Sequence, residues 1–389
     1  MTEIRLGIDV GGTFTDCVVL NKGQLFLDKI FTNPKSPADA VLEIIARQKI
    51  PGSVRIELAH GTTVATNAIL ERKTARVALI TTSGFKHILH IGRQQRASLY
   101  NPRLMKAEPL VQEDHCLEIK ERMDHQGQVV TPVTDQDLKK LLNKVKKIKP
   151  EAIAISLLYS FRNSLHEEQL ARTLSAHIPC PLSLSSRVSP EIREFERTST
   201  TAIDAAIKPI VSHYLTKITS NLAGLRVEPF HVMQSNGGVN LPEAVMKQPV
   251  NLVLSGPAGG VSACRSLAEL TGEPNLIGLD MGGTSTDVSI IVDGRITTVE
   301  AGKIGGLPMQ LPMIDIETIG AGGGSIAWID QGGLLKVGPH SAGALPGPIC
   351  YQKGGTDLTV SDANLLLGYL PADHFLLNLN MRYRGQNYV

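Results

Sequence analysis

Short apolar runs alternate along the chain with segments whose apolar residues recur at helical spacing. The runs at residues 4–10, 75–81 and 152–157 predict strands, because each is rich in Val, Ile, Leu or Ala and is bounded by polar turns. Residues 37–48 and 135–147 have the three-to-four-residue periodicity of amphipathic helices. This alternation predicts an α/β fold.

A long helical stretch is expected between about residues 189 and 222, connecting two halves of the molecule. We expect it to break near Pro209, since proline lacks the N–H that an interior helical position donates. The chain has 389 residues, more than one small core needs. We therefore expect two domains, residues 1–188 and residues 189–389.

Composition excludes several classes of protein. Hydrophobic residues make up 42% and charged residues 20%, an ordinary globular balance. The basic run at residues 139–149 alternates with Leu and Val at helical spacing, which favours a solvated helix face over a nucleic-acid patch. Five cysteines without a C-x-x-C pair favour reduced thiols. No segment reads as a signal peptide or a membrane span, so we expect a cytoplasmic protein without nucleic-acid or membrane partners.

The most informative pattern is an internal repeat. Residues 7–20 align without gaps to residues 278–291, and seven of the fourteen positions are identical. The two copies are too far apart for a solenoid repeat. They predict two related domains that present the same turn to one shared cleft.

Each copy is an apolar strand that ends in Asp, followed by Gly-Gly-Thr and a second strand. Paired glycines let backbone N–H groups approach an anion closely, and a carboxylate at the strand end can hold Mg²⁺ through water. We expect Asp9 and Asp280 to bind that metal and to be catalytic. A pair of tight hairpins whose Asp accepts backbone N–H bonds is the alternative. The predicted phosphate-binding residues are Gly11, Gly12, Thr13, Thr15 and Asp16 in the first copy, and Gly282, Gly283, Thr284, Thr286 and Asp287 in the second.

These turns resemble the phosphate loops of sugar kinases, actin and heat-shock ATPases. Further stretches resemble the ATP-dependent hydantoinase/5-oxoprolinase family specifically, in that family's order along the chain. The resemblance implies a duplicated actin-like/sugar-kinase (ribonuclease H-like) ATPase fold, with two domains around a nucleotide cleft that takes ATP and Mg²⁺. The stretches that carry it are residues 7–16, 60–67, 254–261, 278–289, 315–325 and 361–364.

Two strand-to-helix turns are candidate cleft segments. The first contains His60, Thr62, Thr63 and Asn67, for which we expect substrate-side roles, catalytic in the case of His60. A hydrogen-bonded structural histidine is the alternative. The second turn precedes a helix that is expected to begin near Val261. This turn could line the nucleotide cleft, or its glycines could serve only a tight strand-to-helix connection. Its predicted cofactor-binding residues are Gly256 and Gly259.

Residues 315–325 form a third candidate. Asp315 is predicted to be catalytic, because with Glu317 it could bind metal or polarise water, although a surface loop with two solvated acids is the alternative. The glycine run that follows is too flexible to be ordered without a partner, either a ligand or a closely packed backbone. Its predicted cofactor-binding residues are Gly322, Gly323 and Gly324. The other histidines lack zinc-site spacing.

The resemblance implies ATP-dependent ring opening of a cyclic amide or imide, such as hydantoin, N-methylhydantoin or 5-oxoproline. Phosphorylating the carbonyl oxygen turns the amide, a poor electrophile, into a good one. The resemblance also implies a hydantoinase-B-type partner subunit in an oligomer. An acetone- or acetophenone-type carboxylase subunit and a non-catalytic actin-like nucleotide-binding protein are the alternatives. Family members are usually longer, and a Gly-Gly-Ala-Gly-Pro turn is missing. We therefore expect additional residues in the native protein between about Phe375 and Met381, and weak ATP binding without them.

Overall fold

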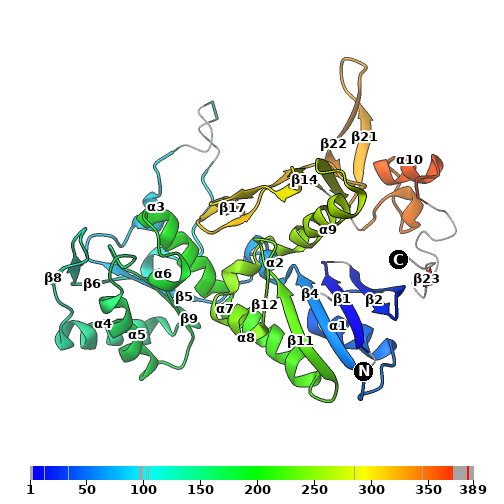
Figure 1. The fold of residues 1–389 in the computed structure, drawn as a ribbon. Helices are drawn as coiled ribbons and strands as arrows, with labels where there is room; N and C mark the ends of the chain where they lie inside the picture. Colours follow the sequence, from blue (N-terminus) through cyan, green and yellow to red (C-terminus); the bar gives the residue numbers. More distant parts are fainter. Residues whose placement is uncertain are drawn as a thin grey trace.

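The computed structural model describes residues 3–370, except 13, 34, 96–99, 102, 104, 284 and 344, together with residues 383–384. The junction between Phe375 and Met381 lies outside these residues. The fold is mixed α/β, as predicted, and it contains parallel strands in two sheets (Figure 1).

The largest sheet carries the first repeated turn. Its strands follow the order β12-β11-β4-β1-β2-β3-β23, with β1, β4 and β11 parallel and β1-β2-β3 an antiparallel meander. Strand β1 alternates buried and less buried residues, and its buried face packs on α1 and α7. The bounds are β1 Glu3–Val10, β2 Phe14–Asn21, β3 Gln24–Phe31, β4 Arg55–Thr62, β11 Arg226–Met233, β12 Val239–Asn240, β23 Tyr383–Arg384, α1 Pro37–Arg47, α2 Val64–Leu70 and α8 Pro242–Lys247.

This sheet bears on the predicted domain boundary at residue 188. Strands β11 and β12 follow that boundary, yet β11 pairs in parallel with β4 from before it. The two halves of the sequence are therefore interleaved in space, because a strand is placed by its pairing partner and not by its position along the chain.

A second sheet is fully parallel, in the order β10-β9-β5-β6. Helices α4 and α5 cover one face and α7 covers the other, so β5 and β9 are buried throughout. Such two-sided burial is the usual environment of parallel strands. The bounds are β5 Val77–Thr82, β6 Cys116–Ile119, β9 Ala152–Ser156, β10 Leu182–Leu184, β7 Arg122–Met123, β8 Val129–Thr131, α3 Ile88–Ile91, α4 Asp135–Ile148, α5 Leu165–Ser175, α6 Ser185–Val188 and η1 Glu113–His115.

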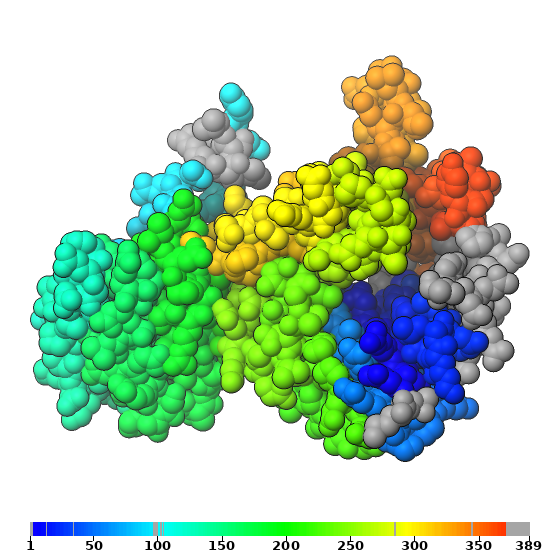
Figure 2. Space-filling model, in the orientation of Figure 1, coloured from blue at the N-terminus to red at the C-terminus, as the bar shows by residue number. Residues whose placement is uncertain are grey.

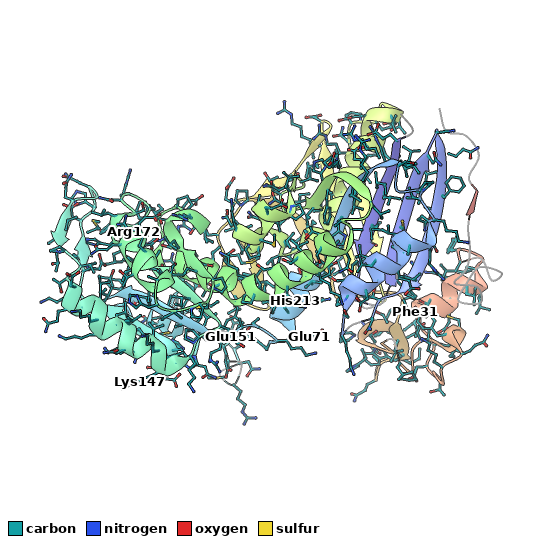
Figure 3. All side chains as sticks on the ribbon, turned by 90° about the horizontal axis from the view of Figure 1, so that it is seen from below. Phe31, Glu71, Lys147, Glu151, Arg172 and His213 are labelled. Atoms are coloured by element: carbon teal, nitrogen blue, oxygen red, sulfur yellow. The ribbon has the colours of Figure 1, made fainter. Side chains whose placement is uncertain are left out.

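The basic run at residues 139–149 lies mostly on α4. Its lysines are exposed, whereas Leu141 and Val145 are buried, and Lys147 lies at the outer edge of this lobe in Figure 3. The predicted solvated helix face is confirmed.

Helix α7 (Glu194–Asn221) connects the two sheets as one continuous helix of 28 residues. The predicted break at Pro209 is wrong. A proline inside a helix costs about 3 kcal/mol. Burial of side chains on both sides of Pro209, against both sheets, offsets this cost.

The second repeated turn lies on a smaller antiparallel sheet of β13, β14, β15 and β20. Helix α9 covers one face of this sheet. In Figure 2 the α9 segment lies over the blue N-terminal strands with a recess between them. The bounds are α9 Ser255–Thr271, β13 Leu276–Met281, β14 Thr286–Val292, β15 Arg295–Ile296, β16 Thr298–Val299, β17 Gly302–Ile304, β18 Leu307–Met309, β19 Met313–Ile314, β20 Ile316–Ile319, β21 Ser325–Ile329, β22 Leu335–Ser341, α10 Val360–Leu366, η2 Pro249–Leu252 and η3 Ile349–Tyr351.

All five cysteines are unpaired thiols in the structure. None of the described helices combines the length and the apolar character that crossing a membrane requires.

Candidate functional site

The first repeated turn joins β1 to β2. Asp9 lies opposite Asp16 in the antiparallel pairing, and the Gly11 N–H donates to the Phe14 carbonyl at 2.9 Å. Gly12 is exposed at the tip of the turn. The turn therefore presents a carboxylate and an open stretch of backbone at one sheet edge.

The second repeated turn joins β13 to β14 in the same way. Asp280 lies opposite Asp287, and the Gly282 N–H donates to the Ser285 carbonyl, again at 2.9 Å. Gly283 is exposed at the tip. Both copies of the sequence repeat thus form the same hairpin.

The threonine that follows each hairpin turn points into the protein. The hydroxyl of Thr15 lies 2.9 Å from that of Thr32 in the core, and Thr286 donates to the Ala321 carbonyl at 2.6 Å. The prediction that these two threonines donate to a phosphate is wrong. Both side chains are buried, at 0% and 6% exposed, and their hydroxyls have partners within the protein.

The second Asp of each copy contacts a neighbouring strand. Asp16 forms an ion pair with Lys29 at 2.7 Å, and Asp287 accepts a hydrogen bond from Thr318 at 2.7 Å. Their phosphate-binding role stays a prediction. The remaining predicted donors lie outside the described residues: Thr13 and Thr284.

The charge of Asp280 acts on Asp9, although the two residues lie in different sheets. Burial raises the pKa of Asp9 to about 6, aided by the carboxylates of Asp16 and Asp280 and opposed by Lys29. Asp9 still reaches solvent, although protein encloses most of its surroundings. The charge of Asp280 at the second turn thus reaches Asp9 at the first.

Asp9 and Asp280 suit a hydrated Mg²⁺, because this cation prefers carboxylate oxygens and keeps several of its waters. Among the described residues, no group of three or more His, Cys, Asp or Glu side chains could hold a metal ion. The donor set therefore fits a cation that is shared with water and phosphate oxygens, not an all-protein cage.

Gly61 makes room for the Asp9 carboxylate. The parallel pairing of β1 with β4 sets Gly61 beside Asp9, and a Cβ at position 61 would lie 2.6 Å from Asp9 Oδ1. Sequence reasoning did not assign this glycine a role, although its place in the His-Gly-Thr-Thr turn was a usable signal.

The His60 residue lies in the core and is only 1% exposed. Its Nδ1 is 3.1 Å from the Ile8 carbonyl and its Nε2 is 2.8 Å from the Tyr214 hydroxyl, which also interacts with Thr62. Burial lowers the pKa of His60 to about 4, which favours the neutral ring. We therefore correct the substrate-side position predicted for His60 and for the fully buried Thr62: both lie in a structural network.

Thr63 and Asn67 remain beside the first turn. Thr63 donates to the Val10 carbonyl at 3.2 Å, and Asn67 Nδ2 donates to the Thr63 hydroxyl at 3.1 Å. A Cβ at Gly12 would lie 3.7 Å from Asn67 Nδ2. Thr63 is the residue before α2, but its side chain does not cap the helix. Both side chains border the exposed turn, and their substrate-side role stays a prediction.

Helix α9 begins at Ser255 and not near Val261, so the expected turn is the first part of the helix. A Cβ at Gly256 would lie 3.2 Å from Thr63 Cγ2, whereas one at Gly259 would have an ordinary contact at 4.0 Å. Gly256 thus allows close packing of the helix start on the turn before α2. Nucleotide contact by Gly256 and Gly259 stays a prediction.

The glycine run packs against the second turn. The N–H groups of Gly323 and Gly324 donate to the carbonyls of Gly282 and Gly283 at 2.8 and 2.7 Å. A Cβ at Gly324 would lie 2.8 Å from the Gly283 oxygen, and Gly322 is buried beside it. The partner of this run is therefore a neighbouring backbone. The direct ligand contact predicted for these three buried glycines is corrected to support of the turn.

Two family models match nearly the whole chain between them. The hydantoinase/oxoprolinase N-terminal region model matches residues 5–178, and the hydantoinase/oxoprolinase model matches residues 197–384. The chain belongs to the hydantoinase/oxoprolinase family.

Three relatives illustrate the range of this family. The caprolactamase alpha subunit of Pseudomonas jessenii is 36% identical over 99% of this chain and 57% of its own length. The 5-oxoprolinase of Saccharomyces cerevisiae is 36% identical over 96% of this chain, but over only 32% of its own length. The crystal structure of nucleotide-free acetone carboxylase matches 97% of this chain and 56% of its own, with a TM-score of 0.77 and 27% identity.

The crystal structure of the ATP-dependent caprolactamase from P. jessenii superposes with a TM-score of 0.83 at 36% identity, over 94% of this chain and 55% of its own. This hydantoinase/oxoprolinase-family chain thus spans about half the length of that relative, and a third of the 5-oxoprolinase.

Asp315 is separated from the site in this family member. Ile319, at one end of β20, lies opposite Thr286 beside the second turn, and Asp315 precedes the other end. At about 3.3 Å per residue, Asp315 lies roughly 13 Å along the strand from that end. Glu317 is exposed on β20. The direction of β20 therefore carries Asp315 away from the second turn, and its catalytic role together with Glu317 stays a prediction.

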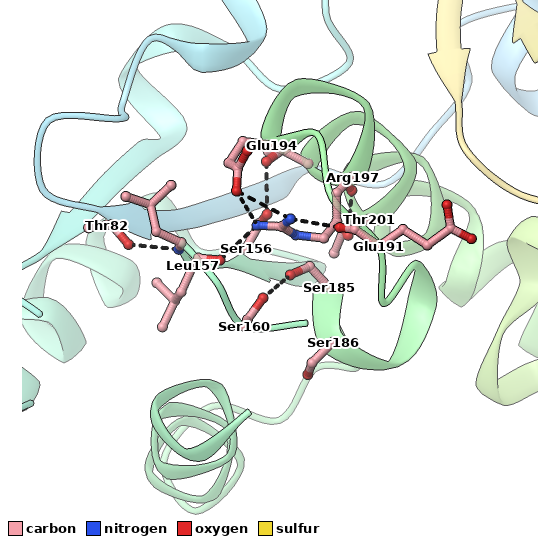
Figure 4. A network of polar contacts seen from close by, with 12 residues as sticks. Thr82, Ser156, Leu157, Ser160, Ser185, Ser186, Glu191, Glu194, Arg197 and Thr201 are labelled. Atoms are coloured by element: carbon pink, nitrogen blue, oxygen red, sulfur yellow. Dashed lines mark hydrogen bonds and ion pairs between the residues drawn. The ribbon is translucent and has the colours of Figure 1, made fainter. Parts of the chain in front are cut away.

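A buried polar network in the parallel-sheet lobe gave no sequence signal. The Arg197 guanidinium on α7 donates to the carbonyls of Leu157 and Glu191, both at 2.9 Å, and lies 3.4 Å from the Glu194 carboxylate (Figure 4). It holds the start of α7 at the carboxyl end of β9. The same helix carries Tyr214, so the network helps to position α7 below the first turn.

Cation binding at Asp9 is expected to weaken as the pH falls through about 6, because protonation removes the ligand charge. Without a cation, the free energy of unfolding should decrease as the pH rises from 3.8 to about 6, since the folded pKa lies above the ordinary value. Carboxyl ¹³C NMR measures the titration directly. In Asp280→Asn the pKa of Asp9 should move down, and an Asp9 pKa that is unchanged in this variant would contradict the shared site.

Tyr214→Phe is expected to destabilise the fold by about 1–3 kcal/mol, because it leaves the buried His60 Nε2 without a partner. Denaturant unfolding of the purified chain measures this loss. Tyr369→Phe is the matched control, since the Tyr369 ring is 76% exposed. An equal, small effect of both substitutions would show that the His60–Tyr214 contact contributes nothing.

Proposed function

We propose that this chain binds Mg²⁺-ATP between its two repeated turns and transfers the terminal phosphoryl group to the carbonyl oxygen of a cyclic amide, which water then opens. The observation that carries the proposal is the pair of Asp-ended hairpins with the same backbone closure, placed so that the charge of Asp280 acts on Asp9. One hairpin alone could be structural. Two that border one site suit an anion with several charged oxygens.

We further propose that the fold is the duplicated actin-like ATPase fold, with the nucleotide between the sheet of β1 and β2 and the sheet of β13 and β14. The division at residue 188 is kept as a proposal about duplicated halves. In this proposal β11 and β12, from the second half of the sequence, contribute to the first sheet.

The chemistry explains why ATP is needed. The amide oxygen attacks the terminal phosphorus, the bond to the ADP oxygen breaks, and an O-phosphorylated imidate forms. Water then adds to the carbon, and the C–N bond breaks as the nitrogen takes a proton, which leaves a ring-opened acyl phosphate. A second water hydrolyses this acyl phosphate to the carboxylate and free phosphate. Bound Mg²⁺ would neutralise charge on the transferred group. The exposed backbones of Gly12 and Gly283 would orient its oxygens, and Asp9 and Asp280 would hold the cation's water shell.

The relatives support a cyclic-amide substrate, because caprolactamase and 5-oxoprolinase are named for lactams and the former is ATP-dependent. Caprolactamase is also named as a subunit, which supports a second polypeptide, here a hydantoinase-B-type partner in an oligomer. The likeness to acetone carboxylase supports one other candidate, an ATP-using carboxylase subunit in which an enol or bicarbonate oxygen is phosphorylated.

Phosphate release by the assembled enzyme is expected to rise at least about tenfold with one cyclic amide, since closure over the correct substrate completes the site. The assay compares caprolactam, 5-oxoproline, hydantoin and N-methylhydantoin with the open-chain control N-methylacetamide. Mass spectrometry should detect the ring-opened product. Stimulation by acetone or acetophenone with bicarbonate would assign the carboxylase instead. Rapid release indifferent to every addition would favour an independent ATPase.

A further inference from the structure

The sheet of β13, β14 and β20 has one covered face. Residues directly opposite each other on antiparallel strands lie on the same face of a sheet. Gly278 pairs with Ser289, and a Cβ at Gly278 would lie 2.9 Å from Cys264 Sγ on α9. Ile291 and Ile316 belong to the same buried cluster as α9. This face is closed.

The opposite face carries an aliphatic stripe. Ile277 pairs with Ile290, Leu279 with Val288, and Ile319 lies across from Thr286 on the neighbouring strand. Ile277, Leu279 and Ile290 are 69%, 70% and 51% exposed. We call this surface the open face, and its apolar members are Ile277, Leu279, Met281, Val288, Ile290, Val292 and Ile319.

Such a surface is unusual for a monomer in water. Isolated exposed aliphatic side chains are common, but contiguous apolar patches usually mark an interaction site. The stripe follows the two-residue period of the strands through β13 and β14, and it continues onto β20 at Ile319. It therefore has the pattern of a sheet face built to be covered.

The relatives indicate what covers it. The caprolactamase shares this fold at a TM-score of 0.83, yet the match covers only 55% of that chain. A large part of the relative's polypeptide thus lies outside the shared fold. We infer that the open face is the docking surface for amphipathic α-helices of the kind of polypeptide that this relative carries outside the match.

The chemistry of the occupant follows from the surface. Helix α9 already covers the other face, and a helical layer on each side is a common way to bury a sheet in an α/β fold. Glu317 is an exposed acidic side chain and pairs with Val288, which places it among the aliphatic residues. The docking helix therefore needs an apolar stripe and one basic residue that meets Glu317.

Methionine oxidation tests this docking. Met281 on the open face is 54% exposed, and Met105, far away in sequence and outside this sheet, is 81% exposed. The comparison is between this chain alone and a chimera in which it replaces the matched part of the caprolactamase alpha subunit. In the chimera, hydrogen peroxide should oxidise Met281 at least about tenfold more slowly, while Met105 keeps its rate.

Two variants link protection to the surface. Ile277→Lys with Ile290→Lys should restore Met281 oxidation in the chimera, because lysines cannot be buried there unpaired. Leu165→Lys with Ile192→Lys is the matched control, since both of these side chains are exposed elsewhere. If the chimera does not fold, the unmatched part of the caprolactamase alpha subunit is added as a separate chain. Met281 oxidation is then compared with and without it.

Two results would overturn the inference. In the first, Met281 is oxidised equally fast with and without the added polypeptide, so the face stays open. In the second, Met281 of the chain alone becomes protected as its own concentration rises, so a second copy is the occupant. Neither result bears on ATP use at the two turns.

Discussion

Asp9→Asn is expected to lower ATP turnover of the assembled enzyme by at least about 100-fold, the usual scale for removing a positioned electrostatic group. Asp280→Asn should have an effect of the same size, because each carboxylate comes from one hairpin of the shared site. Asparagine keeps the shape of the side chain but cannot supply the negative charge. Phosphate release at saturating ATP and Mg²⁺ measures the change.

Stability separates this loss from unfolding. Asp9 and Asp280 repel each other, and burial disfavours a charge on Asp9, so Asp9→Asn should leave the thermal midpoint equal or higher. Asp293→Asn is the matched control, because Asp293 is exposed at the turn between β14 and β15 and has the left-handed backbone that asparagine accepts. Near wild-type turnover in either site variant would reject the assignment of these carboxylates.

Gly61→Ala is expected to lower ATP turnover by about 10–100-fold without unfolding the protein, because a misplacement of about 1 Å can cost that much in rate. The new Cβ would lie 2.6 Å from Asp9 Oδ1, a distance that no carbon–oxygen contact tolerates. The carboxylate is the end of a side chain, so it moves instead of the backbone. The Mg²⁺ concentration needed for half-maximal turnover should rise as well.

Gly7→Ala controls for the loss of a glycine in the same sheet. A Cβ at Gly7 would meet only Val18 Cβ, at 4.0 Å, which is an ordinary contact. This variant should keep both turnover and Mg²⁺ dependence. If Gly61→Ala behaved like Gly7→Ala, the Asp9 carboxylate would not depend on the space that Gly61 leaves.

Sequence alone determined the two hairpins and most of the α/β elements. Each hairpin is closed by one backbone hydrogen bond between residues three apart, Gly11 to Phe14 and Gly282 to Ser285, and each strand has its own apolar period. Such features depend on neighbours in the chain. The duplication was equally visible, because both copies keep the residues that such a turn requires.

Only the tertiary structure decided which predicted side chains reach the site. Thr15, Thr286 and His60 are polar residues in the predicted segments, yet tertiary packing buries all three and gives their polar atoms partners within the protein. Asp315 was close in sequence to the glycine run, but the antiparallel direction of β20 carries it away from the turn.

The same reason applies to Gly61 and to the glycine run at residues 322–324. Their lack of a Cβ is explained by atoms distant in sequence, the Asp9 carboxylate and the Gly283 carbonyl. A local pattern can show that glycine is needed, but not what approaches it. The sequence therefore determined which elements form and which turns are repeated. Tertiary packing decided which atoms share a site. The contacts among the two sheets, α7 and residues 320–325 join residues that are distant in sequence, and no local pattern relates such residues.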